Sequence, residues 1–482
     1  MVAIPFPAGT YPGTRPQESA GRLINAVSEP LGDGGQKLIR APGLTSFATY
    51  NPLFSLLDPT QAYRGAIERL GVLFVAYKNS IAMINAAGVV TQVPGSAPTF
   101  PGSDKVTFAK NNHVTGGSLD PQILAVSDAG TFEVTASAIT ELVSVPAVFN
   151  SICFGDGYFF GTTAAGQVFA SGLNATTWNA LDVAQANASA DALVRGVFYE
   201  RELFLMGEET IEAWSNTGNP TGFPFSRSAI IRHGLLNKSA VTGMENGWGG
   251  QLYWVANDSS VRRLEGYAAQ RVSTPDLERL LAAADPAEIE CWNAVSGGHA
   301  YVFVGTPDWT WAFDTTTSQW HERQSYERLH WRATGPSINV FDRWFMGDRY
   351  SGSLLELTEA SPTELGQPLI FHVESAQGKG FPTPMRVDSA HFDFVTGVGN
   401  EQGQDPIETD PRIDIYWSDD GGATWSHPLV RHLGRQGRTG QRASVFRTGR
   451  TTPKGRRWRL RVADPVYVSL LGGDMQVRAS KS

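Results

Sequence analysis

The stretch Ala300-Tyr301-Val302-Phe303-Val304 is a short apolar run between two turns, and its pattern recurs along the 482-residue chain. The other copies are residues 71–75, 122–126, 157–160, 202–205, 251–255 and 343–346. Their spacing averages about 45 residues, which is typical of four-stranded propeller blades. Such a blade buries its faces only against its neighbours, so the repeat predicts a closed ring. We therefore expect a β-propeller of six or seven blades.

The repeat ends near residue 362, and the sequence on either side of it differs in character. Residues 1–44 are rich in Gly and Pro and read as an extended segment, so we place the propeller at 45–362. A linker is expected near Gly366. Apolar and polar residues alternate after it, as in residues 412–417, which predicts a small C-terminal β-sandwich over 366–482. The predicted fold class is all-β, with one helix that begins at Thr274 and Pro275.

The chain lacks the usual signals of export and membrane insertion. No apolar run reaches the roughly 18 residues of a membrane span, and the first residues do not resemble a signal peptide. The two cysteines, Cys153 and Cys291, lie among apolar residues, so we expect buried free thiols rather than a disulfide. These features predict a soluble product of a reducing cytoplasm that does not insert into membranes.

The net charge of −8 is distributed unevenly. Residues 431–461 include eleven Lys or Arg and no Asp or Glu, so an acidic body carries a basic patch. In residues 457–462 a period of two places Arg457, Arg459 and Arg461 on one face of a strand, opposite three apolar residues. Further basic residues lie in a predicted loop or hairpin arm: Arg435, Arg438, Arg442, Arg447, Arg450 and Lys454.

Two interpretations of this patch remain open. It is either a solvated sheet face or a surface that contacts DNA phosphates or an acidic partner subunit.

Residues 418–425 fit the pattern S-x-D-x-G-x-T-W of the Asp-box hairpin, which sialidase propellers repeat across their blades. We expect Ser418 and Asp420 to bond amides of the turn, Gly422 to adopt a positive φ, and Trp425 to pack beneath the hairpin, with Thr424 completing the pattern. A single box outside the predicted propeller indicates a structural hairpin. A glycan-binding or sialidase-like propeller is the alternative function.

Other signals of enzyme chemistry are absent from the sequence. The nine histidines have no metal-ligand spacing, and no G-x-S-x-G nucleophile motif occurs. We therefore expect no catalytic site, no metal and no cofactor.

Several motifs follow one another across nearly the whole chain. They include Gly21-Arg22-Leu23-Ile24-Asn25, Arg40-Ala41-Pro42-Gly43-Leu44, Trp178-Asn179-Ala180-Leu181-Asp182, Trp311-Ala312-Phe313-Asp314, Gln319-Trp320-His321-Glu322-Arg323 and Val462-Ala463-Asp464-Pro465-Val466. With these motifs in this order, the sequence resembles the packaged-DNA stabilisation proteins of tailed bacteriophages. Those proteins are the tail-hub or nozzle subunits of short-tailed phages.

The resemblance implies a structural virion protein that is made in the host bacterial cytoplasm and assembled into the phage tail. It implies a homohexamer below the portal and adaptor complex, which forms the conduit for genomic DNA and holds the packaged DNA inside the head. It also implies attachment of tail fibre, spike or plug proteins to the ring.

Overall fold

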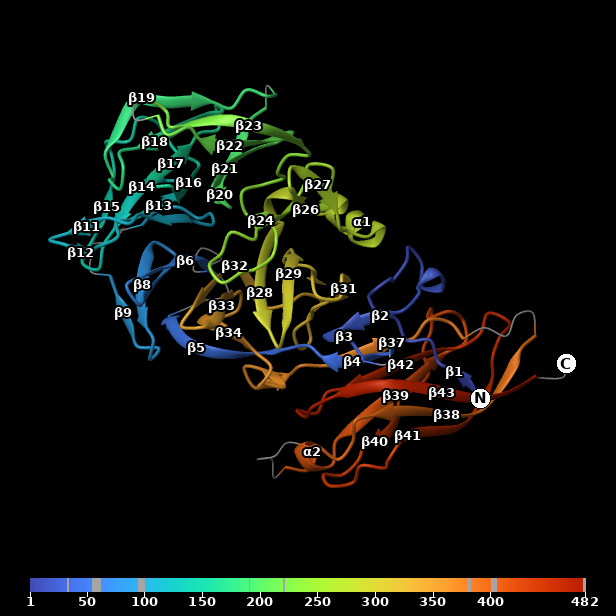
Figure 1. The fold of residues 1–482 in the computed structure, drawn as a ribbon. Helices are drawn as coiled ribbons and strands as arrows, with labels where there is room; N and C mark the ends of the chain where they lie inside the picture. Colours follow the sequence, from blue (N-terminus) through green and yellow to red (C-terminus); the bar gives the residue numbers. More distant parts are fainter. Residues whose placement is uncertain are drawn as a thin grey trace.

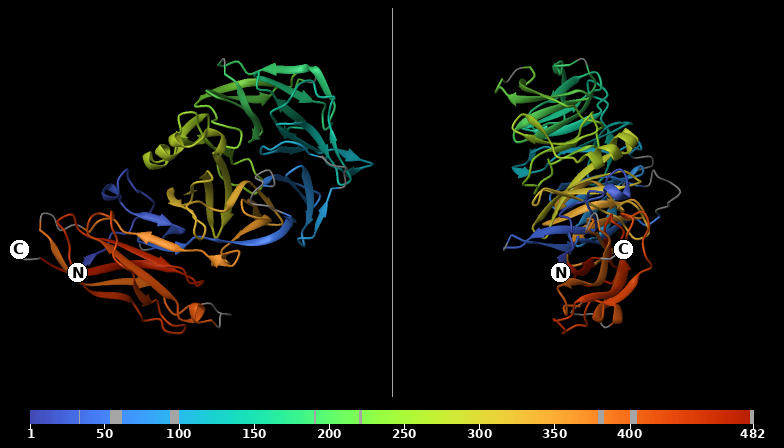
Figure 2. Two further views of the ribbon diagram at one scale, coloured as in Figure 1. Left: turned by 180° about the vertical axis from the view of Figure 1, so that it is seen from behind. Right: turned by 90° about the vertical axis from the view of Figure 1, so that its right-hand side faces the viewer.

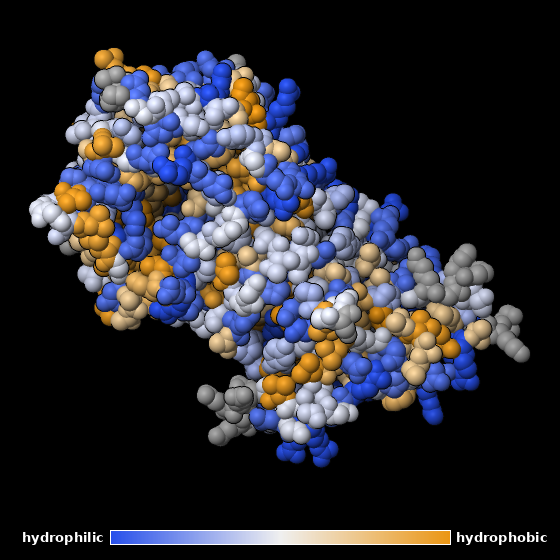
Figure 3. Space-filling view, viewed as in Figure 1, coloured by the Kyte–Doolittle hydropathy of each residue, from blue (hydrophilic) through white to orange (hydrophobic). Residues whose placement is uncertain are grey.

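The computed structural model describes residues 1–32, 34–53, 62–93, 100–189, 191–219, 222–378, 383–399 and 405–479. These residues form a ring of β-sheets and a second all-β domain, which contains both the first and the last strand of the chain (Figure 1). Views from behind and from the side show the two domains lying end to end (Figure 2). Hydrophilic and hydrophobic residues are interspersed over both domains on the face drawn in Figure 3.

The ring is a propeller whose described residues form seven four-stranded blades. From the innermost strand outward the first four blades are β6 (Tyr63–Arg69), β7 (Val72–Tyr77), β8 (Ser80–Asn85), β9 (Val90–Gln92); β10 (Thr107–Lys110), β13 (Ile123–Ser127), β14 (Gly130–Val134), β15 (Ile139–Glu141); β16 (Ser151–Gly155), β17 (Tyr158–Thr162), β18 (Gln167–Ser171), β19 (Trp178–Gln185); and β20 (Leu193–Tyr199), β21 (Glu202–Gly207), β22 (Thr210–Asn216), β23 (Phe225–Arg232). The last three are β24 (Val241–Thr242), β25 (Tyr253–Val255), β26 (Val261–Glu265), β27 (Ala268–Arg271); β28 (Glu290–Ser296), β29 (His299–Gly305), β30 (Thr310–Asp314), β31 (Gln319–Glu322); and β32 (Ala333–Val340), β33 (Arg343–Asp348), β34 (Gly352–Thr358), β5 (Gly43–Asn51). The predicted fold class is confirmed.

The second strand of each blade contains one of the seven repeated apolar runs. In β7, Leu73 and Val75 pack against the seventh blade, whereas Phe74 packs against the second blade. Both faces of such a strand are buried between neighbouring blades, so successive residues are all apolar and the alternation of a half-exposed strand is lost. This double burial explains why these strands carry the strongest signal in the sequence.

The N-terminal part of the chain closes the ring. Strand β5 pairs antiparallel with β34, with Leu44 opposite Leu357, and it supplies the outermost strand of the seventh blade. Leu44 and Tyr50 of β5 are fully buried. The ring is therefore closed by β-pairing between segments about 300 residues apart, as closure of a propeller requires.

The second domain is a β-sandwich. One sheet has the order β3 (Ala26–Pro30), β4 (Gln36–Arg40), β43 (Ser469–Ala479), β38 (Met385–Phe394), β41 (Ala443–Arg450), and β1 (Val2–Ala3) also pairs with β43. The other contains β2 (Arg22–Ile24), β37 (Phe371–Glu374), β42 (Arg457–Val462), β39 (Arg412–Ser418) and β40 (Leu429–His432). Residues 1–44, which the sequence predicts as extended, thus supply β1 to β4.

The second sandwich sheet is continuous with the sixth blade. Strand β2 pairs in parallel with β31 of that blade and antiparallel with β37, giving one nine-stranded sheet from β28 to β40. Near Gly366, where the sequence predicts a linker, the short strands β35 (Thr363–Glu364) and β36 (Gln367–Pro368) extend the sheet of the seventh blade. Backbone hydrogen bonds therefore connect the two domains.

A few smaller elements complete the described structure. The predicted helix is confirmed as α1 (Pro275–Ala283), in which the Thr274 side chain accepts a hydrogen bond from the Leu277 amide and Leu277 and Leu281 are buried. A short helix, α2 (Pro406–Thr409), precedes β39, and the hairpin of β11 (Val114–Thr115) and β12 (Ser118–Leu119) projects from the second blade (Figure 1).

Candidate functional site

The predicted basic residues differ in their exposure and in their contacts within the chain. The exposed ones are Arg435 and Arg438 in the loop between β40 and β41, Arg447 and Arg450 on β41, and Lys454 in the loop before β42. β41 is an edge strand of its sheet. These five residues, which we call the exposed basic group, are available to a partner.

Arg442, at the start of β41, is engaged within the chain. Its Nε donates to Asp393 at 2.6 Å, and its Nη2 donates to Asp393 at 3.0 Å and to Asp474 at 2.7 Å. The two aspartates lie on β38 and β43, so Arg442 ties three strands of one sheet together.

Strand β42 has the predicted alternation. Trp458, Leu460 and Val462 are fully buried in the sandwich core, and the three arginines lie on the other face. That face is not solvated at Arg457, whose side chain is only 2% exposed.

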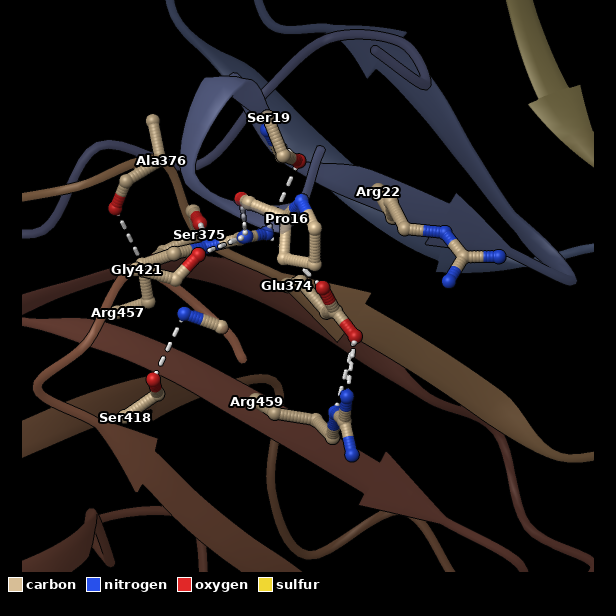
Figure 4. Close-up of polar contacts among 12 residues, drawn as sticks. Pro16, Ser19, Arg22, Glu374, Ser375, Ala376, Ser418, Gly421, Arg457 and Arg459 are labelled. Atoms are coloured by element: carbon tan, nitrogen blue, oxygen red, sulfur yellow. Dashed lines mark hydrogen bonds and ion pairs between the residues drawn. The ribbon is translucent and has the colours of Figure 1, made fainter. Parts of the chain in front are cut away.

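Arg457 is surrounded by hydrogen-bond acceptors from segments far apart in the sequence (Figure 4). It donates to the carbonyl oxygens of Ser375, Pro16 and Gly421, to the Ser19 hydroxyl, and to Glu374 Oε2 at 2.9 Å. These bonds join the N-terminal segment, β37, β42 and the Asp-box turn. Because its donors are used inside the fold, Arg457 has a structural environment rather than that of a partner contact.

Glu374 is the acidic centre of this cluster. Arg459 Nε donates to its Oε1 at 2.9 Å, and His372 lies at 3.2 Å from the same oxygen. Burial alone would raise the pKa of Glu374, but the hydrogen bond with His372 and the charges of Arg459 and Arg22 lower it to about 2. Burial lowers the pKa of His372 to about 4, so His372 is neutral near pH 7 while Glu374 is ionised.

The charges continue across the joint between the domains. Arg22 of β2 forms a bidentate pair with Glu322 of β31, at 2.9 and 2.6 Å, and Arg22 is the register partner of Glu374. Glu322, Arg22, Glu374 and Arg459 therefore alternate in sign over four neighbouring strands. Bidentate, hydrogen-bonded pairs of this kind fix strand positions as well as neutralise buried charge.

The Asp-box forms the turn between β39 and β40. Ser418 Oγ accepts from the Gly422 amide at 2.8 Å, and Asp420 accepts from the amide and the hydroxyl of Thr424. Gly422 has a φ of +97°. The Trp425 ring lies under the arginine face, with Arg459 Cζ 3.8 Å from its centroid. The hairpin thus supports the arginine cluster.

Arg461 has a different environment from Arg457 and Arg459. Its register partners are His372 on β37 and Asp414 on β39. No described residue accepts a hydrogen bond from its buried Nε or forms an ion pair with its guanidinium within 4 Å. Burial raises the pKa of Asp414, while the nearby Arg461 lowers it in part.

The centre of the propeller contains a cavity of about 590 Å³. Its lining comes from the innermost strands of five blades and the loop after β24, and includes the apolar side chains of Ile67, Phe108, Phe154 and Phe198. A second cavity of about 30 Å³ is lined by Lys105, Lys238 and Glu290, which lie just before or at the start of the innermost strands β10, β24 and β28. The wide cavity has the size of a small-molecule pocket.

The described residues contain no candidate metal site and no helix that could span a membrane. They contain no group of three or more His, Cys, Asp or Glu side chains placed to hold an ion. None of the helices in the described ranges is long and apolar enough to cross a bilayer. Both cysteines are free; Cys291 is buried as expected, whereas Cys153 lines the central cavity and is partly exposed.

Comparison with known families decides what this arrangement belongs to. A family model of the bacteriophage P22 Gp10 β-propeller matches residues 24–361, and a model of the bacteriophage P22 Gp10 β-sandwich matches residues 384–478. The chain belongs to the Gp10 family. The resemblance inferred from the sequence motifs is confirmed, and the chain is a Gp10-like phage DNA stabilisation protein.

Comparisons with individual proteins add little to the Gp10 match. The computationally designed protein Ika8 is 10% identical, with a TM-score of 0.38, over 65% of this chain and 99% of Ika8. The YCF48 protein of Cyanidioschyzon merolae is 9% identical, with a TM-score of 0.41, over 66% of this chain and 99% of YCF48. A search of curated proteins gives no match.

Some residues of the charge cluster around Arg457 and Glu374 could not be predicted from the sequence of this Gp10-family protein. Arg456, which is fully buried, pairs with Asp419 at 2.8 Å and donates to Thr448, yet in the sequence it is one more member of a basic run. Glu374 lies 83 residues from Arg457, in a stretch without a recognisable motif. The only available signal is that an arginine beside core residues such as Trp458 needs a buried acidic partner.

Proposed function

We propose that this chain is a subunit of a six-membered ring that forms the tail hub, or nozzle, below the portal and its adaptor. The observation that carries the proposal is the match of both domains to the Gp10 family, over residues 24–361 and 384–478. In this role the ring retains packaged DNA, provides its exit conduit and holds tail fibre, spike or plug proteins. The function is mechanical and needs no catalytic residue.

The dimensions of the propeller support a conduit between subunits. The cavity at the centre of one propeller measures about 590 Å³, a size suited to a small ligand and far below that of a DNA duplex. Head-to-tail contacts that close around an axis leave a shared central opening. Outside residues 431–461 the chain is strongly acidic, which disfavours adhesion of passing DNA phosphates.

The exposed basic group is proposed to contact an acidic surface on an adjoining tail subunit. Five cations on and beside an edge strand attract a complementary surface and orient its docking. The same cations placed on DNA would hold phosphates tightly and slow ejection. We therefore favour the protein contact over the DNA contact.

The test of ring formation mixes the purified chain with portal–adaptor complex and measures the mass of the product. Six bound copies per complex are expected, and another stoichiometry contradicts the hexamer. The same assay then uses a variant in which Arg435, Arg438, Arg447, Arg450 and Lys454 are replaced by Glu. A matched control replaces the exposed propeller residues Arg201 and Arg232 by Glu.

The protein-contact proposal predicts that the five-residue variant stays folded and fails to attach, whereas the control attaches normally. Exposed arginines contribute little to stability, so the loss would not reflect unfolding. A DNA contact would instead allow attachment and cause genome leakage that increases with salt. Normal attachment together with normal DNA retention would contradict both contacts.

A further inference from the structure

Arg461 lines a crevice between the two domains. The crevice has a volume of about 230 Å³. Its propeller side is formed by residues 324–329, and its sandwich side by Ile370, His372 and Arg461, with Ile24 and Asn25 between them. A ligand held there would touch both domains at once.

The donors of Arg461 are not used by the part of the chain that the structure describes. Among those residues none accepts a hydrogen bond from its guanidinium, and its Nε is buried without a partner. Arg457 and Arg459, on the same strand face, share the carboxylate of Glu374. A half-buried guanidinium with unused donors is unfavourable unless an acceptor is supplied from outside the fold.

No described charged group around the crevice forms an ion pair with Arg461 within 4 Å. Arg328 also lines it and is held with its Cζ 3.6 Å from the Tyr350 ring centroid, without an ion pair among the described residues. Glu327 is the acidic residue in the lining. His372 is neutral at pH 7, because burial lowers its pKa to about 4. Asp414 is the register partner of Arg461 on β39, and neither it nor Glu327 forms an ion pair with Arg461 within 4 Å.

We propose that this crevice binds a single oxyanion, a carboxylate or phosphate group, with the guanidinium of Arg461 as its principal donor. The planar guanidinium presents paired donors that match the two oxygens of such a group. The oxyanion comes either from free inorganic phosphate or from an acidic side chain of a bound protein. A DNA backbone presents a row of phosphates, which a crevice of about 230 Å³ does not accommodate.

Occupation of the crevice would stabilise the joint, because a ligand that binds only the folded state raises the stability of that state. The site is a property of the isolated chain, so its test does not depend on ring assembly.

The experiment measures thermal unfolding of the full chain in rising sodium phosphate, against sodium chloride at equal ionic strength. A second series uses an N-acetylated, C-amidated tetraglutamate peptide as the carboxylate probe. The variants are Arg461→Gln, Arg461→Lys, and Arg450→Gln as a control for an exposed arginine of the same domain. Phosphorus NMR line width reports phosphate binding directly, so a variant with altered stability remains interpretable.

We expect a saturable rise of the unfolding temperature in the unmodified chain and in Arg450→Gln, which is lost in Arg461→Gln and weakened in Arg461→Lys. A response to phosphate identifies the free anion as a sufficient ligand, whereas a response to the peptide alone identifies an acidic side chain. The proposal is wrong if neither probe stabilises the unmodified chain, or if Arg461→Gln responds and broadens the phosphorus signal as the unmodified chain does.

Discussion

At the scale of single residues, the basic residues of the C-terminal run have several separate uses. Arg457 and Arg459 neutralise Glu374 inside the joint, Arg442 links strands through Asp393 and Asp474, and the exposed basic group faces solvent. The period of two in residues 457–462 predicts which face is apolar. It does not predict that the arginine face is covered, because the residues that cover Arg457 are up to 441 positions away along the chain.

Replacement of Arg457 by Met should destabilise the sandwich strongly. The change leaves Glu374 buried with less compensation and removes one donor from each of three backbone carbonyl oxygens. Loss of one partner from a buried pair costs about 3–5 kcal/mol of unfolding free energy. The denaturant midpoint should fall by that free energy divided by the m value. The control Arg447→Met removes an exposed arginine and should stay within about 0.5 kcal/mol. Similar midpoints for both variants would show that the Arg457 cluster carries no special stability.

His372 should make the stability of the chain depend on pH below neutrality. Its pKa is about 4 in the fold, against an ordinary value near 6.5, so the unfolded chain takes up the proton first as pH falls. The stability that the neutral, buried His372 contributes is fully present above pH 6.5 and is lost as pH falls towards 4. In His372→Gln the slope of the unfolding free energy against pH should be smaller by up to about 1.4 kcal/mol per unit in that window. Denaturant titrations at several pH values measure the slope, and an unchanged slope would rule out His372 as its source.

At the scale of elements, the strands that the sequence reveals are those buried on both faces. The seven apolar runs mark β7, β13, β17, β21, β25, β29 and β33, because each is enclosed by two neighbouring blades. The short N-terminal strands give no such signal. β1 has two residues and pairs with Met475 and Asp474 of β43, so its formation depends on a partner at the other end of the chain. Local patterns cannot specify such pairing.

The hydrogen bonds of the Asp-box should stabilise the turn of its hairpin. The pKa of Asp420 is lowered to about 2 because hydrogen bonds from Thr424 and Ser418 outweigh the opposing effect of burial. In Asp420→Ala the turn loses those acceptors, which should cost about 1–2 kcal/mol. Hydrogen exchange should accelerate at the amides of Gly422 and Thr424, and also near Trp425, which packs on Arg459. Thr424→Ser keeps the hydroxyl and serves as the control; equal exchange in both variants would contradict this account.

At the scale of the whole molecule, the nine-stranded sheet makes the two domains mechanically continuous. The connection between them, which the sequence predicts as a linker near Gly366, is hydrogen-bonded along much of its length. The Leu365 amide donates to Leu44, and the amides of Ser375 and Ala376 donate to Trp458 and Pro5. In the proposed role between the head and distal tail parts, such continuity would let force pass through backbone hydrogen bonds.

Deletion of residues 1–42 should therefore weaken the joint more than it weakens the propeller. The deletion removes β1 to β4, including the bridging strand β2 and the Arg22–Glu322 pair, but it retains β5, which closes the ring. The exposed edges of β31 and β37 then lack their partner, and residues 359–378 lose contacts that shield them from protease. We expect the full chain to resist limited proteolysis there, and the shortened chain to be cut in that interval and to leave a propeller fragment.

As a control, Leu23→Ala keeps every strand and should unfold at a lower temperature without this cleavage. Equal resistance of the full and shortened chains would mean that the N-terminal strands do not hold the two domains together.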